Sequence, residues 1–151
     1  MPLSPEMRRC NRIYKEFEDI YREIDRWAGL SASAFGILYH LMDLGDGCLQ
    51  RDICAEAFVS KQTVNSSIRT LERQGLIRLT PGRGREEHIH FTEKGRRLAE
   101  ERILPVMEAE NRTLAELGED AALVLALQQK HLEIFRRRAR ALIANQSDET
   151  T

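Results

Sequence analysis

The chain has 151 residues and a formal net charge of −1 at pH 7, a length that lets one domain bury a sizeable core without disulfides. Charged residues make up 31% of it and hydrophobic residues 42%, with few glycines and prolines, which predicts a soluble and mainly helical fold. The sequence has neither a signal-peptide pattern nor a run of about 18 apolar residues, so we expect a cytoplasmic protein and no membrane partner.

The N-terminal part of the chain predicts two helices. From Glu6 to Gly29, apolar residues recur at alternating spacings of four and three, the stripe of a long amphipathic helix. Gly29 ends this helix, and Ser31 or Ser33 can cap the next one. Residues 44–47, Leu-Gly-Asp-Gly, then break the second helix.

The middle of the chain predicts two further helices separated by a turn. The first covers Gln50 to Ala57, and residues 58–60 form the turn. Ser60 can cap the second helix, about Lys61 to Gln74. The periodicity of this helix directs three apolar residues inward: Val64, Ile68 and Leu71.

A hairpin follows, and then two long helices. Leu76–Leu79 and His88–Phe91 read as short strands, and Pro81, Gly82 and Gly84 between them favour a turn. Thr92 can cap a fifth helix, which we expect to kink or break at Pro105. Gly118 separates it from a last helix, about Asp120 to Ala144, and the tail after it is polar.

A helix, a turn, a helix and a hairpin in this order are typical of a winged helix-turn-helix, which binds duplex DNA. Such a unit reads the major groove with polar side chains near the N-terminus of its second helix and touches the flanking DNA with the hairpin tip. Taken alone, the polar residues can also be an ordinary solvated helix face. The predicted DNA-binding residues are Ser60, Lys61, Gln62, Thr63, Asn65, Ser66 and Arg69 on the helix, with Arg83 and Arg85 on the hairpin.

A net charge near zero does not argue against DNA binding, because phosphates respond to a local basic face. Glutamate and aspartate concentrate in the outer helices. The predicted winged unit holds the basic cluster Lys61, Arg69, Arg73, Arg78, Arg83 and Arg85.

The segment SKQTVNSSIRTLERQGLI, followed by a turn and IHFTEKG, resembles the MarR family of bacterial transcription regulators over nearly the whole chain. The resemblance implies a homodimer held by the outer helices and a palindromic operator, usually bound as a repressor that a small molecule, an oxidant or, in a few members, a metal releases. The wing of that family usually reads Asp-x-Arg. Here Arg85 matches the arginine, and Arg83 replaces the acidic residue.

This interpretation divides the chain by function. We expect an N-terminal dimerisation helix in residues 1–30 and a DNA-binding unit in 31–92. C-terminal dimerisation helices then cover 93–145, and a polar tail covers 146–151. The fold class is therefore mainly α with a small β-hairpin wing, and the outer helices are more useful for dimerisation than for closing a monomeric bundle.

The signal that the protein senses is less defined. Cys10 lies in sequence among Arg8, Arg9 and Arg12, whose charge favours a reactive thiolate; an incidental cysteine is the simpler interpretation. Cys48 is a second redox candidate, and Cys54 is expected in the core. An effector pocket can be lined by Trp27, Phe35, Tyr39 and His40, although these residues equally suit a core.

Other functions have weaker support. His88 and His90 share a strand face, yet a third metal ligand is not evident, so we expect neither a metal nor another cofactor. A winged-helix module for protein contacts is the main alternative, but it predicts apolar residues where Gln62, Asn65 and Arg69 stand. An enzyme is not expected, because the sequence has no nucleophile elbow, phosphate loop or paired metal motif.

Overall fold

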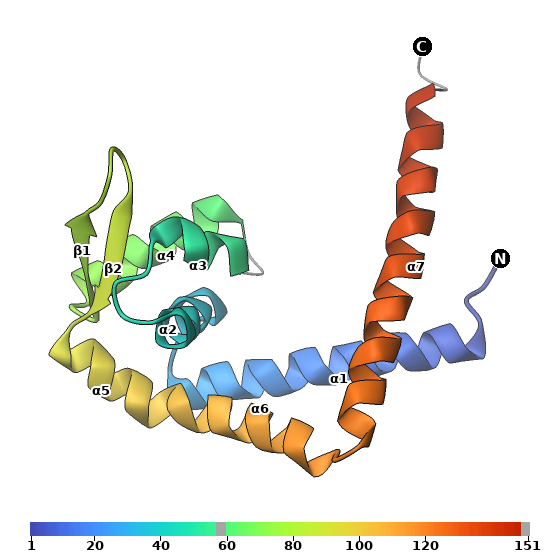
Figure 1. Cartoon of the computed structure of the whole chain (residues 1–151), viewed down its shortest axis with the longest axis horizontal. Helices are drawn as coiled ribbons and strands as arrows, with labels where there is room; N and C mark the ends of the chain where they lie inside the picture. The colour runs from blue at the N-terminus through green and yellow to red at the C-terminus, as the bar shows by residue number, and fades with distance from the viewer. Residues whose placement is uncertain (57–59, 149–151) are drawn as a thin grey trace. The chain divides into compact units, whose positions relative to one another are not determined.

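The computed structural model describes residues 1–56 and 60–148, with side chains described as far as residue 144. Ala57, Phe58 and Val59, expected at the end of a helix and in the turn, lie outside the described residues. The elements, shown in Figure 1, are α1 (Pro5–Ala28), α2 (Ala32–Leu44), α3 (Gln50–Glu56), α4 (Lys61–Arg73), β1 (Ile77–Pro81), β2 (Glu87–Phe91), α5 (Glu93–Arg102), α6 (Leu104–Glu116) and α7 (Asp120–Asp148). Within this part of the chain, every helix is too short or too polar to cross a membrane.

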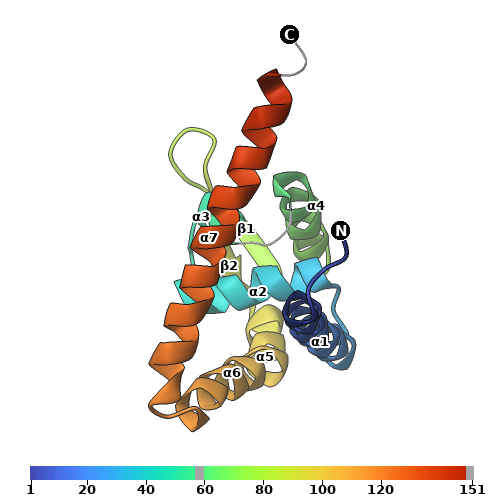
Figure 2. The ribbon, with the colours of Figure 1, turned by 90° about the vertical axis from the view of Figure 1, so that its right-hand side faces the viewer.

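The chain forms two compact units, Met1–Glu108 and the residues from Ala109 onward. In the first unit, α2 lies between two layers: α3, α4 and the hairpin on one side, and α1 and α5 on the other (Figure 2). Helix α2 contacts all four of these helices. The second unit consists of the end of α6 and the long helix α7.

Side-chain caps define the helix starts, as the sequence predicts. The hydroxyl oxygens of Ser31, Ser60 and Thr92 each accept a hydrogen bond from the backbone N–H three residues later, at 3.2, 3.2 and 3.0 Å. Gly29 ends α1 with a φ of 69°, a left-handed conformation that glycine adopts without strain. Local sequence signals thus fix where these helices begin and end.

The hairpin differs from its prediction in two ways. Strand β1 begins at Ile77 and extends to Pro81, which pairs with Glu87 instead of belonging to the turn; a proline is tolerated at the end of an edge strand. The sequence predicts only a helix break at residues 44–47, yet residues 47–49 also pair with β2. Ile89 donates its N–H to the Cys48 carbonyl at 2.9 Å, and Gly47 donates to the Ile89 carbonyl at 2.8 Å.

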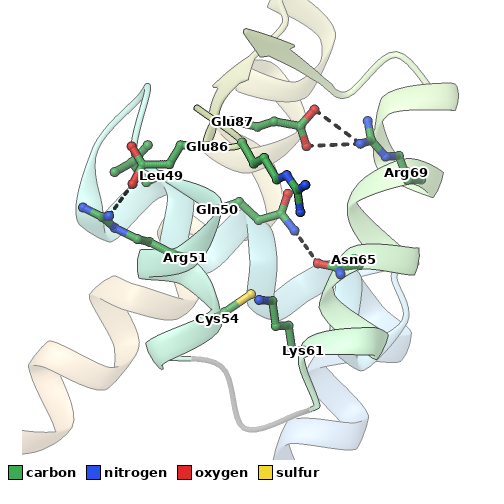
Figure 3. A pocket seen from close by; sticks show the side chains of 10 residues that line it. Leu49, Gln50, Arg51, Cys54, Lys61, Asn65, Arg69, Glu86 and Glu87 are labelled. Carbon is green, nitrogen blue, oxygen red and sulfur yellow. Dashed lines mark hydrogen bonds and ion pairs between the residues drawn. The ribbon is translucent and has the colours of Figure 1, made fainter. Parts of the chain in front are cut away.

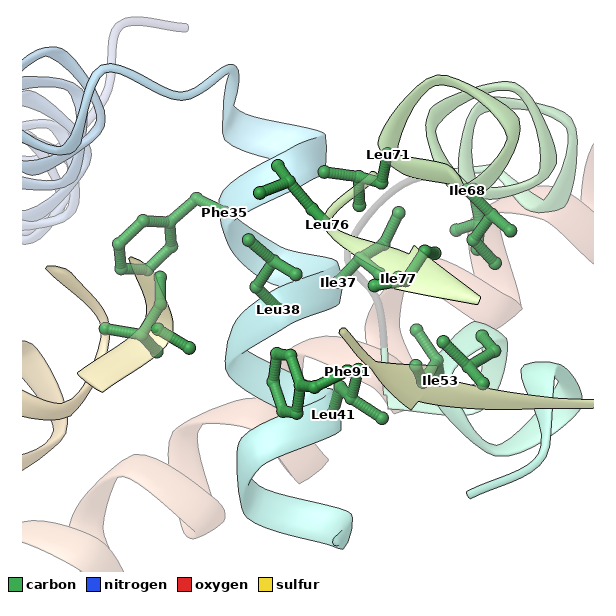
Figure 4. Packing of buried hydrophobic residues seen from close by; sticks show 14 of the residues in the cluster. Phe35, Ile37, Leu38, Leu41, Ile53, Ile68, Leu71, Leu76, Ile77 and Phe91 are labelled. Atoms are coloured by element: carbon green, nitrogen blue, oxygen red, sulfur yellow. The ribbon is translucent and has the colours of Figure 1, made fainter. Parts of the chain in front are cut away.

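The hydrophobic core of the first unit surrounds α2 (Figure 4). Val64, Ile68 and Leu71 of α4 are at most 1% exposed, which confirms the inward face predicted for this helix. They pack in one cluster with Phe35, Ile37, Leu38 and Leu41 of α2, Ile53 of α3, and Leu76, Ile77, Ile89 and Phe91 of the hairpin. This cluster holds α4 and the wing in one rigid unit.

Helix α5 sits directly against the start of β1. A Cβ atom on Gly95 would lie 1.7 Å from the carbonyl oxygen of Leu76, so only glycine allows this approach. The Thr92 N–H and hydroxyl donate to the same carbonyl at 3.1 and 3.2 Å, and Lys94 donates to the Gln74 carbonyl at 2.8 Å. These bonds attach α5 to the end of the winged unit.

The long fifth helix expected from the sequence is two helices. Helix α5 ends at Arg102, and α6 begins at Leu104, one residue before Pro105. Proline lacks the N–H that a continuous helix would need and clashes with the preceding turn. The expected kink or break is therefore a break, which lies at Ile103, two residues before Pro105, and three helices instead of two follow the wing.

Candidate nucleic-acid interface

The predicted DNA-binding residues are all exposed, on two elements of the winged unit. Ser60 and the residues of α4 are held outward because the opposite face of the helix is buried. Arg83 and Arg85 lie in the turn between the strands, where Gly84 takes a φ of 62°. The structure thus exposes all the predicted residues and brings four of them, Lys61, Asn65, Arg69 and Arg85, to one cleft.

A cleft of about 450 Å³ separates α3, α4 and the wing (Figure 3). Lys61, Asn65 and Arg69 line it from α4, one turn apart, and Arg85 lines it from the wing. Because a helix advances about 100° per residue, Gln62 and Ser66 lie beside the cleft on the face opposite the core. Helix α4 therefore offers both a fully outward face and one that looks into the cleft.

Several hydroxyl groups of α4 already have partners within the chain. The Ser60 and Thr63 hydroxyls lie 2.9 Å apart, and the Ser66 hydroxyl donates to the Thr63 carbonyl at 2.9 Å. These bonds stiffen the first turn. Each hydroxyl oxygen retains acceptor capacity, and Lys61 and Gln62 remain available for phosphates or bases.

Arg69 is not the free base-reading residue that the sequence suggests. Its guanidinium donates to both carboxylate oxygens of Glu87 at 3.1 and 3.3 Å, and to Glu72 at 3.3 Å. The hydrogen bond to Glu72 and the negative charge of Glu87 raise the pKa of Arg69. Glu87 is 18 positions away in sequence, so periodicity within α4 could not reveal this pair.

The sequence prediction also missed an interacting pair from α3 and the wing. Arg51 forms an ion pair with Glu86, and both residues line the cleft. The run Arg85-Glu86-Glu87 is visible in the sequence, and two acids directly after a wing arginine were the available signal. The cleft is therefore a mixed-charge surface rather than a purely basic one.

Gln50 is a further residue that the sequence prediction missed. Its side-chain amide nitrogen donates to the side-chain oxygen of Asn65, linking α3 to α4 (Figure 3). The bond leaves the Asn65 amide N–H₂ free to donate and the Gln50 side-chain oxygen free to accept a further hydrogen bond.

The two wing arginines differ in their position relative to the cleft. The Glu86 N–H donates to the Arg83 carbonyl at 3.1 Å, and Gly82 donates to the Glu86 carbonyl at 2.8 Å, so the turn is internally bonded. Within the described part of the chain, neither arginine side chain takes part in an ion pair. Arg85 faces the cleft and Arg83 does not line it.

A second cavity, about 440 Å³, lies between α1 and α2. Of the four predicted pocket residues, Phe35 and His40 line it. Trp27 instead stacks under Arg102, with 5.1 Å between the guanidinium carbon and the ring centroid, and Tyr39 packs against Phe35 and His40. The polar lining comes from Glu18, Tyr21, Arg22, Asp25 and Ser33.

The two cysteines named as redox candidates lie in different surroundings. Partial burial, followed by the charges of Asp52 and Asp46, raises the pKa of Cys48, which disfavours its thiolate. Cys10 is half-buried on α1, where helical geometry turns its side chain about 200° from those of Arg8 and Arg12. Arg8, Arg9 and Arg12 line a shallow hollow together with Glu16.

Two histidines on β2 have structural partners. His88 Nδ1 lies 2.8 Å from the Gly47 carbonyl, and His90 Nε2 lies 3.0 Å from the Thr80 hydroxyl. Their rings are 6.5 Å apart. Over the described ranges, no three His, Cys, Asp or Glu side chains are grouped as a metal site would need.

Comparisons with known proteins agree with this geometry. A MarR family model matches residues 28–86, whereas a comparison with curated proteins found no match. The solved MarR family regulator NMB1585 from Neisseria meningitidis is 24% identical and has a TM-score of 0.66, over 88% of this chain and 96% of its own. MepR from S. aureus, solved as a DNA complex, is 22% identical with a TM-score of 0.66, over 89% and 99%.

A third solved structure is BpsR from Bordetella bronchiseptica, whose DNA binding is regulated by 6-hydroxynicotinic acid. It is 20% identical, with a TM-score of 0.64 over 86% of this chain and 99% of its own. These similarities show a shared fold that includes the winged unit. Residues 28–86, which contain the winged unit, are similar to the MarR family, and the solved structures extend this similarity of fold over most of the chain.

Proposed function

We propose that the protein is a sequence-specific DNA-binding regulator that acts as a homodimer on a palindromic operator, as a repressor. The observation that carries this is α4, which presents Gln62, Asn65 and Ser66 to solvent beside a cleft closed by the wing. A single helix fits the major groove, and the wing arginine then reaches the flanking phosphates. We propose the cytoplasm as its compartment, since that is where a bacterial operator lies.

The homodimer is supported by apolar surface that a monomer leaves in water. On α1, the exposed side chains include Ile13, Phe17 and Ile20, at 48, 53 and 54%. On α7, Leu123, Phe135 and Leu142 are 56, 65 and 69% exposed. Apolar stripes of this length on outer helices are typical of an interface.

We further propose that a small aromatic acid binds the cavity between α1 and α2 and releases the DNA. Phe35 and Ile37 offer apolar surface, while Arg22 and His40 offer donors for a carboxylate or hydroxyl. Burial raises the pKa of Asp25, which lines the same cavity, above its usual value. In support, NadR was solved with 4-hydroxyphenylacetate, an aromatic acid.

The test of DNA recognition is selection from a random duplex library with the purified protein, followed by sequencing. We expect an enriched palindrome with half-sites about 10 bp apart, one turn of DNA. Sedimentation at the same protein concentration should give a dimer. A bound pool without any enriched motif would contradict the proposal.

The effector proposal needs its own measurement. Titration of 4-hydroxyphenylacetate or 6-hydroxynicotinate into the protein–operator complex should lower the bound fraction, and Arg22→Ala should weaken that effect. Arg12→Ala serves as the matched control, because it removes the same charge from α1 outside the cavity. Equal responses of the two variants would exclude Arg22 from the effector site.

A further inference from the structure

We propose that Glu86 and Glu87, at the start of β2, compete with DNA phosphates for Arg51 and Arg69 and so increase the preference for the operator over other DNA. This rests on the proposed function. The cleft contains four cationic side chains, Arg51, Lys61, Arg69 and Arg85, and the two wing carboxylates. Each carboxylate is paired with one arginine from a different helix.

The carboxylates are the better-fixed partners in these pairs. The side chains of Glu86 and Glu87 are 33 and 32% exposed, against 68 and 57% for Arg51 and Arg69. The Glu86 backbone is bonded to both sides of the turn, and Glu87 pairs with Pro81 in the sheet. When a phosphate approaches, the arginine side chains can move, whereas the carboxylates stay in the cleft.

Arg69 can meet operator DNA without leaving Glu87. Its contacts to Glu87 and Glu72 use the two terminal nitrogens, and a guanidinium has five N–H donors. The remaining donors, including Nε–H, can reach a base edge while the carboxylates orient the group. A matched base therefore adds a contact and costs no ion pair.

DNA without the matched base offers only phosphates, which bind through charge. A phosphate competes with Glu87 for the positive charge of Arg69, and when Arg69 turns to the phosphate, Glu87 faces the DNA without its partner. The same argument applies to Arg51 and Glu86. The carboxylates therefore weaken binding to non-operator DNA more than binding to the operator, which is selectivity through repulsion of the wrong ligand.

The experiment compares Glu87→Gln with the wild-type protein on two duplexes: the sequence enriched by selection and a scrambled duplex of equal length and composition. We expect affinity for the scrambled duplex to rise about two- to fivefold, the range that an exposed ion pair supports. Affinity for the operator should change less than twofold. The salt dependence on scrambled DNA should steepen by about one released ion, for the phosphate contact that Arg69 gains.

Glu93→Gln is the control, because it removes the same charge from an exposed residue of α5 that pairs with Arg97 outside the cleft. It should leave the ratio of the two affinities unchanged. The proposal is overturned if Glu87→Gln changes the affinity for both duplexes equally. It is also overturned if the substitution lowers only the affinity for the operator, because that result would mean that Glu87 only holds Arg69 in place for operator binding. A wild-type protein that does not distinguish the two duplexes would instead refute the proposed function itself.

Discussion

Helix propensity predicts that substitution of Gly95 by alanine stabilises the protein, whereas the packing around Gly95 predicts that it destabilises the protein. Alanine stabilises a helix interior by about 1 kcal/mol relative to glycine. In this structure, however, the new Cβ would lie 1.7 Å from the Leu76 carbonyl oxygen and 2.7 Å from its carbon. Both are backbone atoms, so α5 itself must move away from β1.

The loss in the free energy of unfolding can be estimated from the overpacking and from the hydrogen bonds that this movement breaks. Overpacking costs about 1–3 kcal/mol, and the two hydrogen bonds from Thr92 to the Leu76 carbonyl contribute about 1 kcal/mol each. After the gain in propensity, Gly95→Ala should lower the free energy of unfolding by about 2–4 kcal/mol. The Tm should fall by about 2–4 °C for each kcal/mol.

The assay is urea unfolding followed by circular dichroism, at one fixed protein concentration because a dimer's stability depends on it. Gly36→Ala is the matched control: Gly36 lies inside α2, and its Cβ would meet no atom within 4 Å. That variant should be more stable than the wild type by about 0.5–1 kcal/mol. A stabilised Gly95→Ala would refute the close packing of α5 against β1.

Three further predictions concern the interface and the cysteines. Gln50→Ala should weaken operator binding by about 1 kcal/mol, the contribution of one hydrogen bond. In a double-mutant cycle, adding Gln50→Ala to Asn65→Ala should cause no further loss of operator affinity. Arg85→Ala should weaken operator and scrambled duplexes alike and flatten the salt dependence by about one ion, measured by anisotropy across a salt series. Because the pKa of Cys48 is raised, its alkylation by iodoacetamide at pH 7 should be slower than that of an unstructured cysteine peptide, and equal rates would contradict its burial.

The sequence predicted those features of the fold that depend on near neighbours. Ser31, Ser60 and Thr92 were identifiable as caps because a cap acts within three residues. The buried face of α4 follows from helical periodicity alone. The break at Pro105 needed only the chemistry of proline, although its full extent did not follow from the sequence.

Features that join distant segments were not predictable. Arg69 meets Glu87 across 18 positions and Gln50 meets Asn65 across 15, and no local pattern encodes either pair. Trp27 was assigned to a pocket because it is aromatic, yet its partner is Arg102, 75 positions away.

The central claim, that α4 reads base sequence, is tested most directly by the affinity of Asn65→Ala for operator and scrambled duplexes, measured by fluorescence anisotropy. Loss of a base contact costs about 1–3 kcal/mol, so we predict an operator affinity about tenfold lower and a scrambled-duplex affinity that does not change. Arg97→Ala on α5, away from the cleft, should preserve the preference for the operator. An Asn65→Ala protein that keeps the full operator preference would contradict the account.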